Sequence, residues 1–555
     1  MSELKKCKVT GEEFLVRDED LEFLKKISPV IKGKILNIPM PTLCPDERTR
    51  RRLTYRNERI LYKRKSSLSN QDIISFYHPE STLKIYSHDE WWSDKWDAMM
   101  FGKDFNFDRE FFEQFYELQL QVPRPPLVNN KAENSPFCNF ADGNKNSYLL
   151  TSSNWNEDCY YGFLVIRNKD AVDCLWCTNC ELVYQCTDCI GGYNLKYCEN
   201  CDNCSDSAFL YNCTGLRNCL FCVNLKNKEY HILNKQVTKE EYENALLFLN
   251  GSHENYKSTI EKFNGYKHDF PVRQANNYVS CENVLGENLF NSKNVHLSFD
   301  LYNSEDCAYS HDGLNGKDCC DICYFDGVEL CYESTSLIGY GYRFTNFCRD
   351  SYNLFYCDNC HSCKNCFGCI GLRNKENCIF NKQYSKDEYE DLFARIIAKM
   401  EETGEWGEFF PAKYSPFAYN ETLALDYFPI TEQEAKKNGY AWVKPDKKEY
   451  QLQKYVIPDS IAEVDEKICN EILSCEVTGK NYKIIPQELR FYKKMKLPIP
   501  QKCPDQRSFE RIKIRNPRQL WERNCAKCGA KVKTTFSPDR KEVIYCEQCY
   551  LKEIG

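Results

Sequence analysis

The sequence has few of the residues and none of the short patterns that point to a familiar enzyme. Only 8 of its 555 residues are histidine, and these are scattered along the chain. It contains no P-loop, no GxGxxG after a strand, no GxSxG and no HExxH. Pairs of carboxylates are frequent, but nothing distinguishes one pair from the others. The sequence therefore predicts no particular reaction, and a non-enzymatic function is the expectation.

Long apolar stretches are also missing. No uninterrupted hydrophobic run is long enough to cross a bilayer, and residues 1–6 carry no signal-peptide pattern. We therefore expect a soluble cytoplasmic protein with no membrane partner. The formal net charge of −7 argues against a protein that coats nucleic acid by bulk charge, although it leaves room for a local basic patch.

Cysteine, tyrosine and phenylalanine are abundant instead. The chain has 35 Cys, 37 Tyr and 33 Phe but only 6 Met. In the cytoplasm so many cysteines should be thiols or metal ligands, because reducing buffers there oppose disulfides. Aromatic residues suit pleated, half-buried surfaces, so the composition favours β-rich or irregular structure over a helical bundle. A chain of this length should form several domains.

The clearest chemical pattern lies close to the C-terminus. Two CxxC pairs, Cys525/Cys528 and Cys546/Cys549, have the spacing of a zinc ribbon. Each pair forms a tight turn that directs two thiolates to one point, and Gly529 suits the positive φ that such a turn often needs. The pattern predicts one Zn²⁺ cofactor held by these four cysteines. The ion should hold a small domain together, and it does not name a reaction.

Two duplications organise the chain, and the first lies in its middle. Residues 219–242 match residues 366–389 without a gap, so two arrays of the same kind follow one another. Each array should close on a helix, because capping-box patterns begin at Thr238 and Ser385.

Within each array, short strand-like segments recur between Asn, Asp and Gly. Cysteines such as Cys174, Cys186, Cys198 and Cys213 fall roughly a dozen residues apart. Short, evenly spaced strands are typical of a β-solenoid, in which stacked coils align like residues in ladders. Cysteine suits an inward ladder because it is small and apolar, and asparagine suits a turn ladder because its side chain bonds to the backbone. We expect a coil of about twenty residues.

The second duplication joins the two ends of the chain. Residues 44–48 match residues 503–507, and the alignment continues at a constant offset. It pairs the four predicted zinc ligands, in order, with Ser66, Ser69, Ser87 and Glu90. The N-terminal copy has therefore lost every ligand, and we expect the same fold there without metal. Trp91, Trp92 and Trp96 are expected to supply the packing that zinc supplies in the other copy.

Several motifs of the C-terminal half occur together. They are Cys-Glu-Val-Thr-Gly at 475–479, Pro-Ile-Pro at 498–500, Cys-Pro-Asp-Gln-Arg at 503–507, Arg-Asn-Pro-Arg at 515–518, the two CxxC pairs, and the segments 381–389, 405–411 and 415–420. Together they resemble a family of uncharacterised Cys-rich zinc-ribbon proteins from small-genome, candidate-phylum bacteria. The resemblance covers most of the chain from near residue 137. It implies architecture and no mechanism, and it assigns no zinc to the N-terminal copy.

A series of arginines persists in both ends. Its members are Arg48, Arg52, Arg56, Arg59 and Arg64 in the first copy and Arg507, Arg511, Arg515, Arg518 and Arg523 in the second. One interpretation is a surface that binds anions, either the phosphates of RNA or DNA or an acidic protein. The other is structural, with the guanidinium groups paired to carboxylates or carbonyls. We favour the structural role, because the copy without zinc ligands has kept all five arginines.

The other cysteines have alternative explanations. The pairs Cys7/Cys44 and Cys475/Cys503 survive where the zinc ligands are lost, so we favour core packing for them. A denser run with a period of three lies at 357–369. We favour buried ladder positions for this run, with additional zinc and an iron–sulfur cluster as alternatives. Nothing in the sequence explains why the period is three rather than two.

These observations predict a mainly β fold with short helices, in which tandem Cys-rich β-solenoid-like arrays are flanked by ribbon-like terminal domains. The expected segments are a zinc-free ribbon-like domain (1–98), a linker (99–136), array 1 (137–275), array 2 (276–400), an aromatic and proline-rich strap (401–465) and a zinc ribbon domain (466–555). The expected function is that of a zinc-containing scaffold or binding protein with a macromolecular partner, either protein or nucleic acid. The alternatives are nucleic-acid binding through the arginine-rich ends and a thiol- or metal-dependent redox function.

Overall fold

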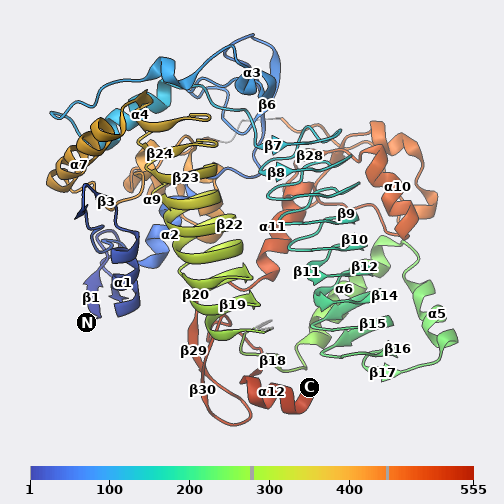
Figure 1. The fold of residues 1–555 in the computed structure, drawn as a ribbon. Coiled ribbons are helices and arrows are strands. Elements are labelled where there is room, and N and C mark those ends of the chain that lie inside the picture. Colours follow the sequence, from blue (N-terminus) through green and yellow to red (C-terminus); the bar gives the residue numbers. More distant parts are fainter. Residues whose placement is uncertain (1, 276–279, 445–448, 555) are drawn as a thin grey trace. The chain divides into compact units, whose positions relative to one another are not determined.

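The computed structural model describes residues 2–275, 280–444 and 449–554 of the chain. The chain forms two compact units, and each combines segments that are far apart in the sequence (Figure 1). Unit 1 consists of Met1–Pro126, Ala275–Lys444 and Arg518–Leu520, and unit 2 consists of Leu127–Gln274, Pro445–Pro517 and Trp521–Gly555. The N-terminal domain therefore belongs with array 2, and most of the C-terminal domain belongs with array 1.

A β-solenoid forms the centre of each unit. In unit 2 its strands are β7 (Asn129–Asn130), β8 (Ala141–Asp142), β9 (Lys169–Val172), β10 (Glu181–Tyr184), β11 (Thr187–Ile190), β12 (Tyr193–Lys196), β13 (Glu199–Asp202), β14 (Ser205–Tyr211), β15 (Arg217–Val223), β16 (Glu229–Ile232) and β17 (Lys235–Gln236). In unit 1 they are β19 (Glu282–Phe290), β20 (Lys293–Tyr302), β21 (Glu305–Ala308), β22 (His311–Arg343), β23 (Arg349–Phe355), β24 (Lys364–Phe367), β25 (Glu376–Ile379) and β26 (Lys382–Gln383). Neighbouring coils pair in parallel, and a short antiparallel strand closes each array. The predicted mainly β fold with solenoid arrays is confirmed.

The coils are shorter than the sequence suggested. Cys189 pairs with Cys201 in unit 2, and Cys307 pairs with Cys319 in unit 1. Side chains at equivalent places in neighbouring coils are mostly 12 residues apart, as in the hydrogen bond from Asn303 to Asn315, and 11 apart in a few coils, as in that from Asn315 to Asp326. The expected coil of about twenty residues is wrong.

A left-handed backbone corner at every third residue explains this short coil. Across β10 to β12, the residues with positive φ are Leu182 (55°), Gln185 (53°), Asp188 (53°), Gly191 (63°) and Asn194 (49°). The residues that directly follow these corners are all buried, namely Val183, Cys186, Cys189, Gly192 and Leu195. Each side of the coil is thus three residues long and supplies one inward side chain. This geometry accounts for the period of three among the cysteines.

Asparagine and aspartate occupy many of these corners. A positive φ is costly for most L-residues, and Asn and Asp adopt it more readily because their short side chains bond locally. Here the side chains also bond along the solenoid. The Asn291 amide donates to Asn303 (3.3 Å), and the Asn303 amide donates to Asn315 (3.2 Å). The structure therefore contains the asparagine ladder that the sequence predicts.

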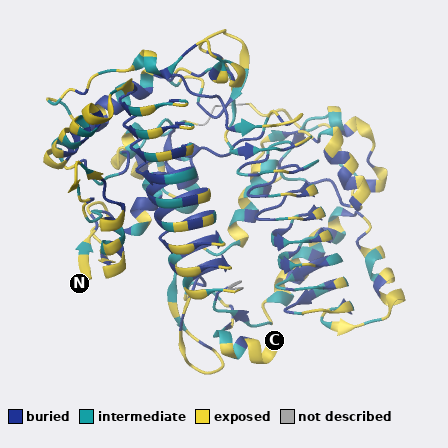
Figure 2. Cartoon of the chain, in the orientation of Figure 1, coloured by how far each residue is buried: buried dark blue, intermediate teal, exposed yellow. Residues whose placement is uncertain are grey.

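The inward cysteines form ladders of hydrogen-bonded thiols. The sulfur of Cys177 lies 3.6 Å from the carbonyl oxygen of Leu175 and 3.3 Å from that of Cys186. The sulfur of Cys360 lies 3.6 Å from the carbonyl oxygen of Asp358 and 3.5 Å from that of Cys369. Carbonyl oxygens accept from an S–H group, so these contacts favour protonated thiols over metal-bound thiolates. The coils that carry these residues are among the most deeply buried parts of each unit (Figure 2).

The helices and short hairpins of unit 1 surround its solenoid. They are β1 (Glu3–Lys6), β2 (Glu13–Val16), α1 (Asp18–Ile27), β3 (Val30–Ile31), β4 (Lys34–Ile35), α2 (Pro45–Leu53), β5 (Tyr62–Lys65), β6 (Asp72–Ser75), α3 (His88–Trp92), η1 (Ala98–Phe101), α4 (Phe111–Gln121), α7 (Lys386–Thr403), η2 (Ala412–Tyr414), η3 (Tyr419–Glu421), α8 (Leu423–Tyr427) and α9 (Glu432–Lys437). Segment 99–136, expected to be a linker, contains α4, whose Phe111 and Phe115 lie in the core of unit 1. That segment is a packed element because its aromatic face covers the solenoid.

The corresponding elements of unit 2 begin after its solenoid. They are α5 (Lys239–Phe248), α6 (His253–Lys267), β18 (Val272–Arg273), η4 (Ile461–Glu463), η5 (Glu466–Asn470), β27 (Leu473–Ser474), β28 (Asn481–Tyr482), α10 (Pro486–Met495), α11 (Pro504–Ile514), β29 (Trp521–Asn524), β30 (Lys531–Thr534), β31 (Ile544–Tyr545) and α12 (Glu547–Ile554). The predicted capping boxes are present, with Thr238 capping α5 and Ser385 capping α7. Among the helices that the structure describes, none is both long and apolar enough to span a membrane.

Candidate metal centre and the arginine contacts of the terminal domains

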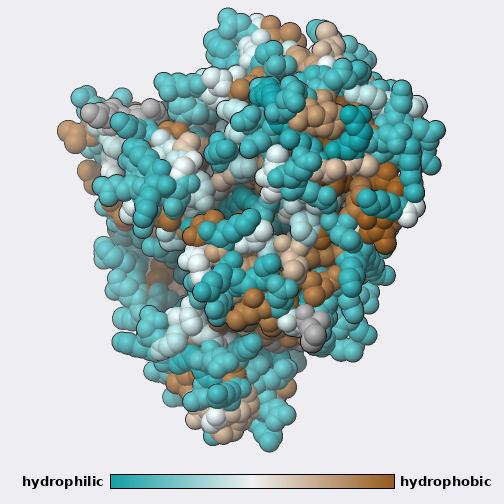
Figure 3. All heavy atoms as spheres, turned by 90° about the vertical axis from the view of Figure 1, so that its left-hand side faces the viewer, coloured by the Kyte–Doolittle hydropathy of each residue, from teal (hydrophilic) through white to brown (hydrophobic). Residues whose placement is uncertain are grey.

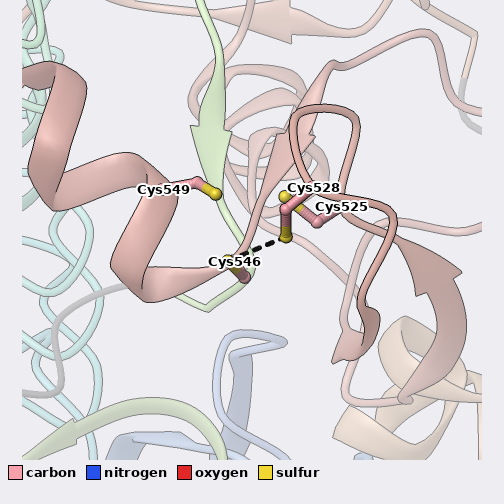
Figure 4. Close-up of side chains that lie close together, drawn as sticks. All are labelled: Cys525, Cys528, Cys546 and Cys549. Atoms are coloured by element: carbon pink, nitrogen blue, oxygen red, sulfur yellow. Dashed lines mark hydrogen bonds between the residues drawn. The ribbon is translucent and has the colours of Figure 1, made fainter.

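Four cysteine sulfurs meet near the C-terminus in unit 2 (Figure 4). The Sγ atoms of Cys525, Cys528, Cys546 and Cys549 all lie within 4.8 Å of one another, and those of Cys528 and Cys546 are 3.7 Å apart. Cys525 is buried, Cys546 and Cys549 are half-buried, and Cys528 is exposed. The group could hold a metal ion. The structure thus brings together the four residues that the sequence singled out.

The first two sulfurs come from the tight turn between β29 and β30. The Cys525 N–H donates to the Ala530 carbonyl (2.8 Å), and the Gly529 N–H donates to the Cys525 carbonyl (2.9 Å). Gly529 has a φ of 75°, which a residue with a Cβ would adopt only with strain. This backbone, which we call the knuckle, turns Cys525 and Cys528 toward the same point.

The other two sulfurs come from the start of α12. Cys546 precedes the helix, and the Tyr550 N–H donates to the Cys546 carbonyl (2.9 Å). Cys549 lies one helical turn on and so faces the same way as Cys546. A hydrogen bond from the Ala526 N–H to the Ile544 carbonyl (2.8 Å) ties the knuckle to this helix start.

The thiols of this group differ in acidity. Burial would raise the pKa of Cys525, but the backbone amides of Cys546 and Cys528 donate to its sulfur and lower the pKa to about 6. Its neighbour Cys546 raises the pKa of Cys549 to about 12 through a hydrogen bond between the two sulfurs. Within the group, Cys525 is therefore the more readily ionised thiol and Cys549 holds its proton more firmly. A bound cation would displace that proton, because only the thiolate is a ligand.

The four cysteine sulfurs suit a metal ion that prefers thiolate ligands. In a tetrahedral site with metal–sulfur bonds of about 2.3 Å, the sulfurs stand about 3.8 Å apart. The distance of 3.7 Å between Cys528 and Cys546 is close to that value. Four protein sulfurs also fill a tetrahedral coordination sphere, so a bound ion would have no position left for substrate.

The N-terminal copy has the same backbone without the cysteines. Its hairpin of β5 and β6 pairs Tyr62 with Ser75 in the register in which β29 and β30 pair Trp521 with Thr534. The knuckle is preserved as well. The Ser66 N–H donates to the Gln71 carbonyl (2.8 Å), and the Asn70 N–H donates to the Ser66 carbonyl (3.0 Å) with φ at Asn70 of 63°.

In this copy a carboxylate occupies the place where the C-terminal copy has its group of cysteines. Glu90 Oε2 accepts from the hydroxyl of Ser66 and from the backbone N–H of Ser87 (2.8 Å), while the Glu90 N–H donates to the Ser87 hydroxyl (3.3 Å). Burial would raise the pKa of Glu90, but the hydrogen bonds from Ser66, Ser69 and Ser87 lower it to about 2. The ionised carboxylate thereby joins the knuckle to the helix start. Of the expected tryptophans, Trp91 and Trp96 are buried beside this centre, whereas Trp92 is 41 % exposed.

Two arginines of α11 hold the C-terminal domain to the solenoid of unit 2. Arg507 Nε lies 2.8 Å from Asp173 Oδ2, and Arg511 Nη1 lies 2.8 Å from Asp173 Oδ1. The guanidinium of Arg507 also lies over the ring of Tyr161, at 5.0 Å from its centroid. The side chain of Asp173 is fully buried, so one carboxylate inside the protein serves two cations.

The N-terminal domain meets the solenoid of unit 1 in the same way. Arg48 and Arg52 of α2 lie 2.9 Å and 3.3 Å from the carboxylate of Asp321. The guanidinium of Arg48 lies over the ring of Tyr309, at 5.2 Å. Asp321 occupies the place in array 2 that Asp173 occupies in array 1, so the two contacts correspond residue by residue.

The remaining arginines of the series also contact acceptors. Their partners are Glu58 for Arg56, Asp426 for Arg59, the His78 carbonyl for Arg64, Asp188 for Arg515, Asp300 and Asp312 for Arg518, and the Ser537 carbonyl for Arg523. All ten guanidinium groups are thus engaged within their own units. These contacts favour the structural role over the phosphate-binding one.

Comparison with known proteins places the chain in no family. No protein-family model matches the chain, and no curated protein matches it.

The carboxylates that receive the arginines are the functional residues that sequence reasoning missed. Asp173 and Arg511 are 338 positions apart in the chain, and no local pattern links them. One signal was available, because Asp173 and Asp321 stand at matching places in the two arrays. A matched pair of carboxylates opposite a matched pair of arginines would have suggested the contact.

Proposed function

We propose that the protein is a non-enzymatic scaffold that holds one structural zinc ion at Cys525, Cys528, Cys546 and Cys549. The observation that carries the proposal is the closed set of four sulfurs, all within 4.8 Å of one another. Catalytic zinc sites keep one position for water or substrate, whereas structural sites use four protein ligands. Thiolate ligands select zinc among the divalent ions that are common in a reducing compartment.

The zinc would stabilise the C-terminal domain, which is attached to the solenoid of unit 2. Knuckle, hairpin and α12 share only a small apolar cluster around Val532, Phe536 and Ile544. So small a core needs a further cross-link to be stable, and four metal–sulfur bonds supply it.

The partner of the scaffold is a macromolecule that contacts the solenoid faces. On the face shown in Figure 3, apolar residues form separate patches among hydrophilic ones. A face of this kind supports recognition through many polar contacts. A protein partner is better supported than nucleic acid, because the arginines that suggested phosphate binding already contact carboxylates and carbonyls.

Metal analysis tests the zinc assignment. The purified protein should contain one equivalent of zinc, and Cys528→Ser should lose it. Cys469→Ser is the matched control, because Cys469 is half-buried, lies in unit 2 and is remote in sequence from the four ligands. Zinc content that is unchanged in Cys528→Ser would contradict the assignment.

A nucleic-acid column tests the scaffold assignment. We expect the full-length protein to elute from it at low salt. Retention that weakens steeply with salt, and that is lost when Arg507, Arg511 and Arg515 are changed to Gln without unfolding, would instead establish nucleic-acid binding.

A further inference from the structure

The knuckle and helix start of the metal centre recur at two further places. Four backbone hydrogen bonds define the arrangement at Cys525 and Cys546: two close the knuckle, one joins the knuckle to the segment before the helix, and one opens the helix. The same four bonds occur at Cys7 and Cys44 and again at Cys475 and Cys503. With the copy at Ser66 and Ser87, the part of the chain that the structure describes contains four such modules, two in each terminal domain.

The correspondence is close at the level of single bonds. In the module of Cys7, the Gly11 N–H donates to the Cys7 carbonyl (2.9 Å) and the Lys8 N–H donates to the Thr42 carbonyl (3.0 Å). In the module of Cys475, the equivalent bonds run from Gly479 to Cys475 (2.9 Å) and from Glu476 to Gln501 (3.0 Å).

In both modules, two of the four ligand positions carry cysteine. One thiol comes from the knuckle and the other from the residue that precedes the helix, Cys44 before α2 and Cys503 before α11. The other two positions carry Thr10 and Glu47 in one module and Thr478 and Gln506 in the other. Each module thus has one sulfur on each side, and a side-chain hydrogen bond joins Cys7 to Cys44 and Cys475 to Cys503.

The surroundings make one thiol of each pair a nucleophile. Burial would raise the pKa of Cys7, but the hydroxyl and backbone N–H of Thr10 donate to its sulfur and lower the pKa to about 7. Burial raises the pKa of Cys44 to about 12, and the charge of Cys7 adds to the rise. The second pair repeats this. Burial would raise the pKa of Cys475, but hydrogen bonds from Thr478 and the backbone N–H of Cys503 lower it to about 7, while burial raises the pKa of Cys503.

The thiols lie directly beneath the protein surface. Cys7 is 3 % exposed, but the knuckle residues around it are exposed, with Val9 at 57 %. Cys475 has the same exposure beneath Val477, which is also 57 % exposed. The ladder thiols, by contrast, lie inside the solenoid.

We propose that Cys7–Cys44 and Cys475–Cys503 are two sites of reversible oxidation, each of which closes into a disulfide on reaction with a hydroperoxide. The thiolate of Cys7 attacks one peroxide oxygen, the O–O bond breaks, and the alcohol leaves with a proton while Cys7 becomes a sulfenic acid. The sulfur of Cys44 then attacks the Cys7 sulfur, and hydroxide leaves and takes up the Cys44 proton as water. Two thiols lose two electrons and two protons, and the hydroperoxide is reduced to alcohol and water.

Peptide mapping of the oxidised protein tests the proposal. The full-length protein is treated with hydrogen peroxide, denatured in an alkylating reagent and digested without reductant. We expect cross-linked peptides that join Cys7 to Cys44 and Cys475 to Cys503, and we expect dithiothreitol to abolish both. Recovery of all four cysteines as alkylated thiols would overturn the proposal, as would a bound metal ion that blocks them.

Two variants sharpen the result. Cys44→Ser should leave Cys7 as a sulfenic acid that reacts with dimedone, and it should not alter the Cys475–Cys503 cross-link, which serves as an internal control. Thr10→Val should slow the first cross-link several-fold and leave the second unchanged. Equal rates in Thr10→Val and the unmodified protein would refute the role of Thr10. The mapping of the unmodified protein decides the proposal even if a variant fails to fold.

Discussion

Buried carboxylates hold the terminal domains in place. Asp173 and Asp321 each receive two guanidinium groups inside the protein. Such an arrangement is neutral or mildly favourable when complete, because desolvation offsets the attraction between the charges. It becomes costly when one member is removed, since the others then remain buried without compensation.

We therefore expect Arg507→Gln to destabilise unit 2 by roughly 3–5 kcal/mol. Urea unfolding followed by tryptophan fluorescence measures this loss. Arg490→Gln is the matched control, because Arg490 belongs to the same domain and is exposed. Equal stability of Arg507→Gln and the unmodified protein would show that the ion pair does not hold the domain.

Glu90 predicts a pH dependence of the N-terminal domain. Its pKa in the folded protein is about 2, below its ordinary value of 4.5. The stability that ionised Glu90 contributes is therefore present above pH 4.5 and is lost as the pH falls from there toward 2. Glu90→Gln should flatten this part of the curve of melting temperature against pH. A curve of unchanged slope in that window would mean that other groups cause the acid sensitivity.

At the scale of the element, the stacking of the solenoid coils could be predicted from the sequence, but their length could not. The recurrence of Cys and Asn predicted stacked coils, because like residues align in ladders. The coil length did not follow from the strand-like segments, because the inward period of an ordinary pleated strand is two and says nothing of corners within a coil. A left-handed corner at every third residue changes the inward period to three, and the spacing of Cys174, Cys177 and Cys180 already carried that period.

The group of four cysteines could be predicted because it depends on local sequence. Its ligand positions depend on two local structures, a knuckle and the first turn of a helix, and each is readable from a CxxC pair. The contacts of the arginines depend on which array each terminal domain packs against. That choice joins residues that are hundreds of positions apart, so no local pattern reveals it.

We expect the ladder thiols to resist alkylation in the folded protein and to react after denaturation. Cys177, Cys189 and Cys360 are 0 % exposed and lie against carbonyl oxygens. Iodoacetamide labelling followed by peptide mapping measures this difference. The exposed Cys528 serves as the positive control once metal has been removed with a chelator. Rapid native labelling of the three ladder thiols would contradict the inward ladder.

The asparagine corners should be sensitive to Cβ strain. Asn303 has a φ of 51° and bonds to Asn291 and Asn315 in neighbouring coils. Asn303→Ala should cost about 1–2 kcal/mol from the left-handed backbone, together with the lost hydrogen bonds. Asn303→Gly removes the same side chain but relieves the strain, so it should cost less. Denaturant unfolding of both variants separates the cost of backbone strain from the cost of the lost hydrogen bonds. Equal losses of stability in the two variants would show that the corner is unstrained.

At the scale of the whole molecule, two units of similar plan come from one chain. Each contains a solenoid, a helix from which two arginines reach one solenoid carboxylate, and that carboxylate, Asp321 in unit 1 and Asp173 in unit 2. One difference between them lies in the terminal modules, because the group of four cysteines belongs to unit 2 and its counterpart in unit 1 is built around Glu90. Loss of metal should therefore affect the two units unequally.

Chelation should loosen only the C-terminal module and the strand that pairs with it. β18 is joined to β31 by hydrogen bonds from Val272 to Val543 and from Gln274 to Tyr545, both of 2.9 Å. Hydrogen exchange measured by mass spectrometry should quicken in 521–554 and 270–274 after chelation. Peptides from the solenoid of unit 1 should exchange as before and serve as the control. Faster exchange throughout both units would show that the metal supports more than its own module.

The twelve-residue coil also constrains how such a protein can change in evolution. An in-frame duplication or deletion of one whole coil keeps every thiol and asparagine in register and alters the length of the array by about 4.8 Å, the spacing of neighbouring strands. An insertion of one or two residues within a side would turn the inward residues of the following coils outward, unless an irregularity such as the register shift between Val284 and Gly286 absorbed it. The length of the array, and with it the distance that the array spans, therefore changes mainly in steps of one whole coil.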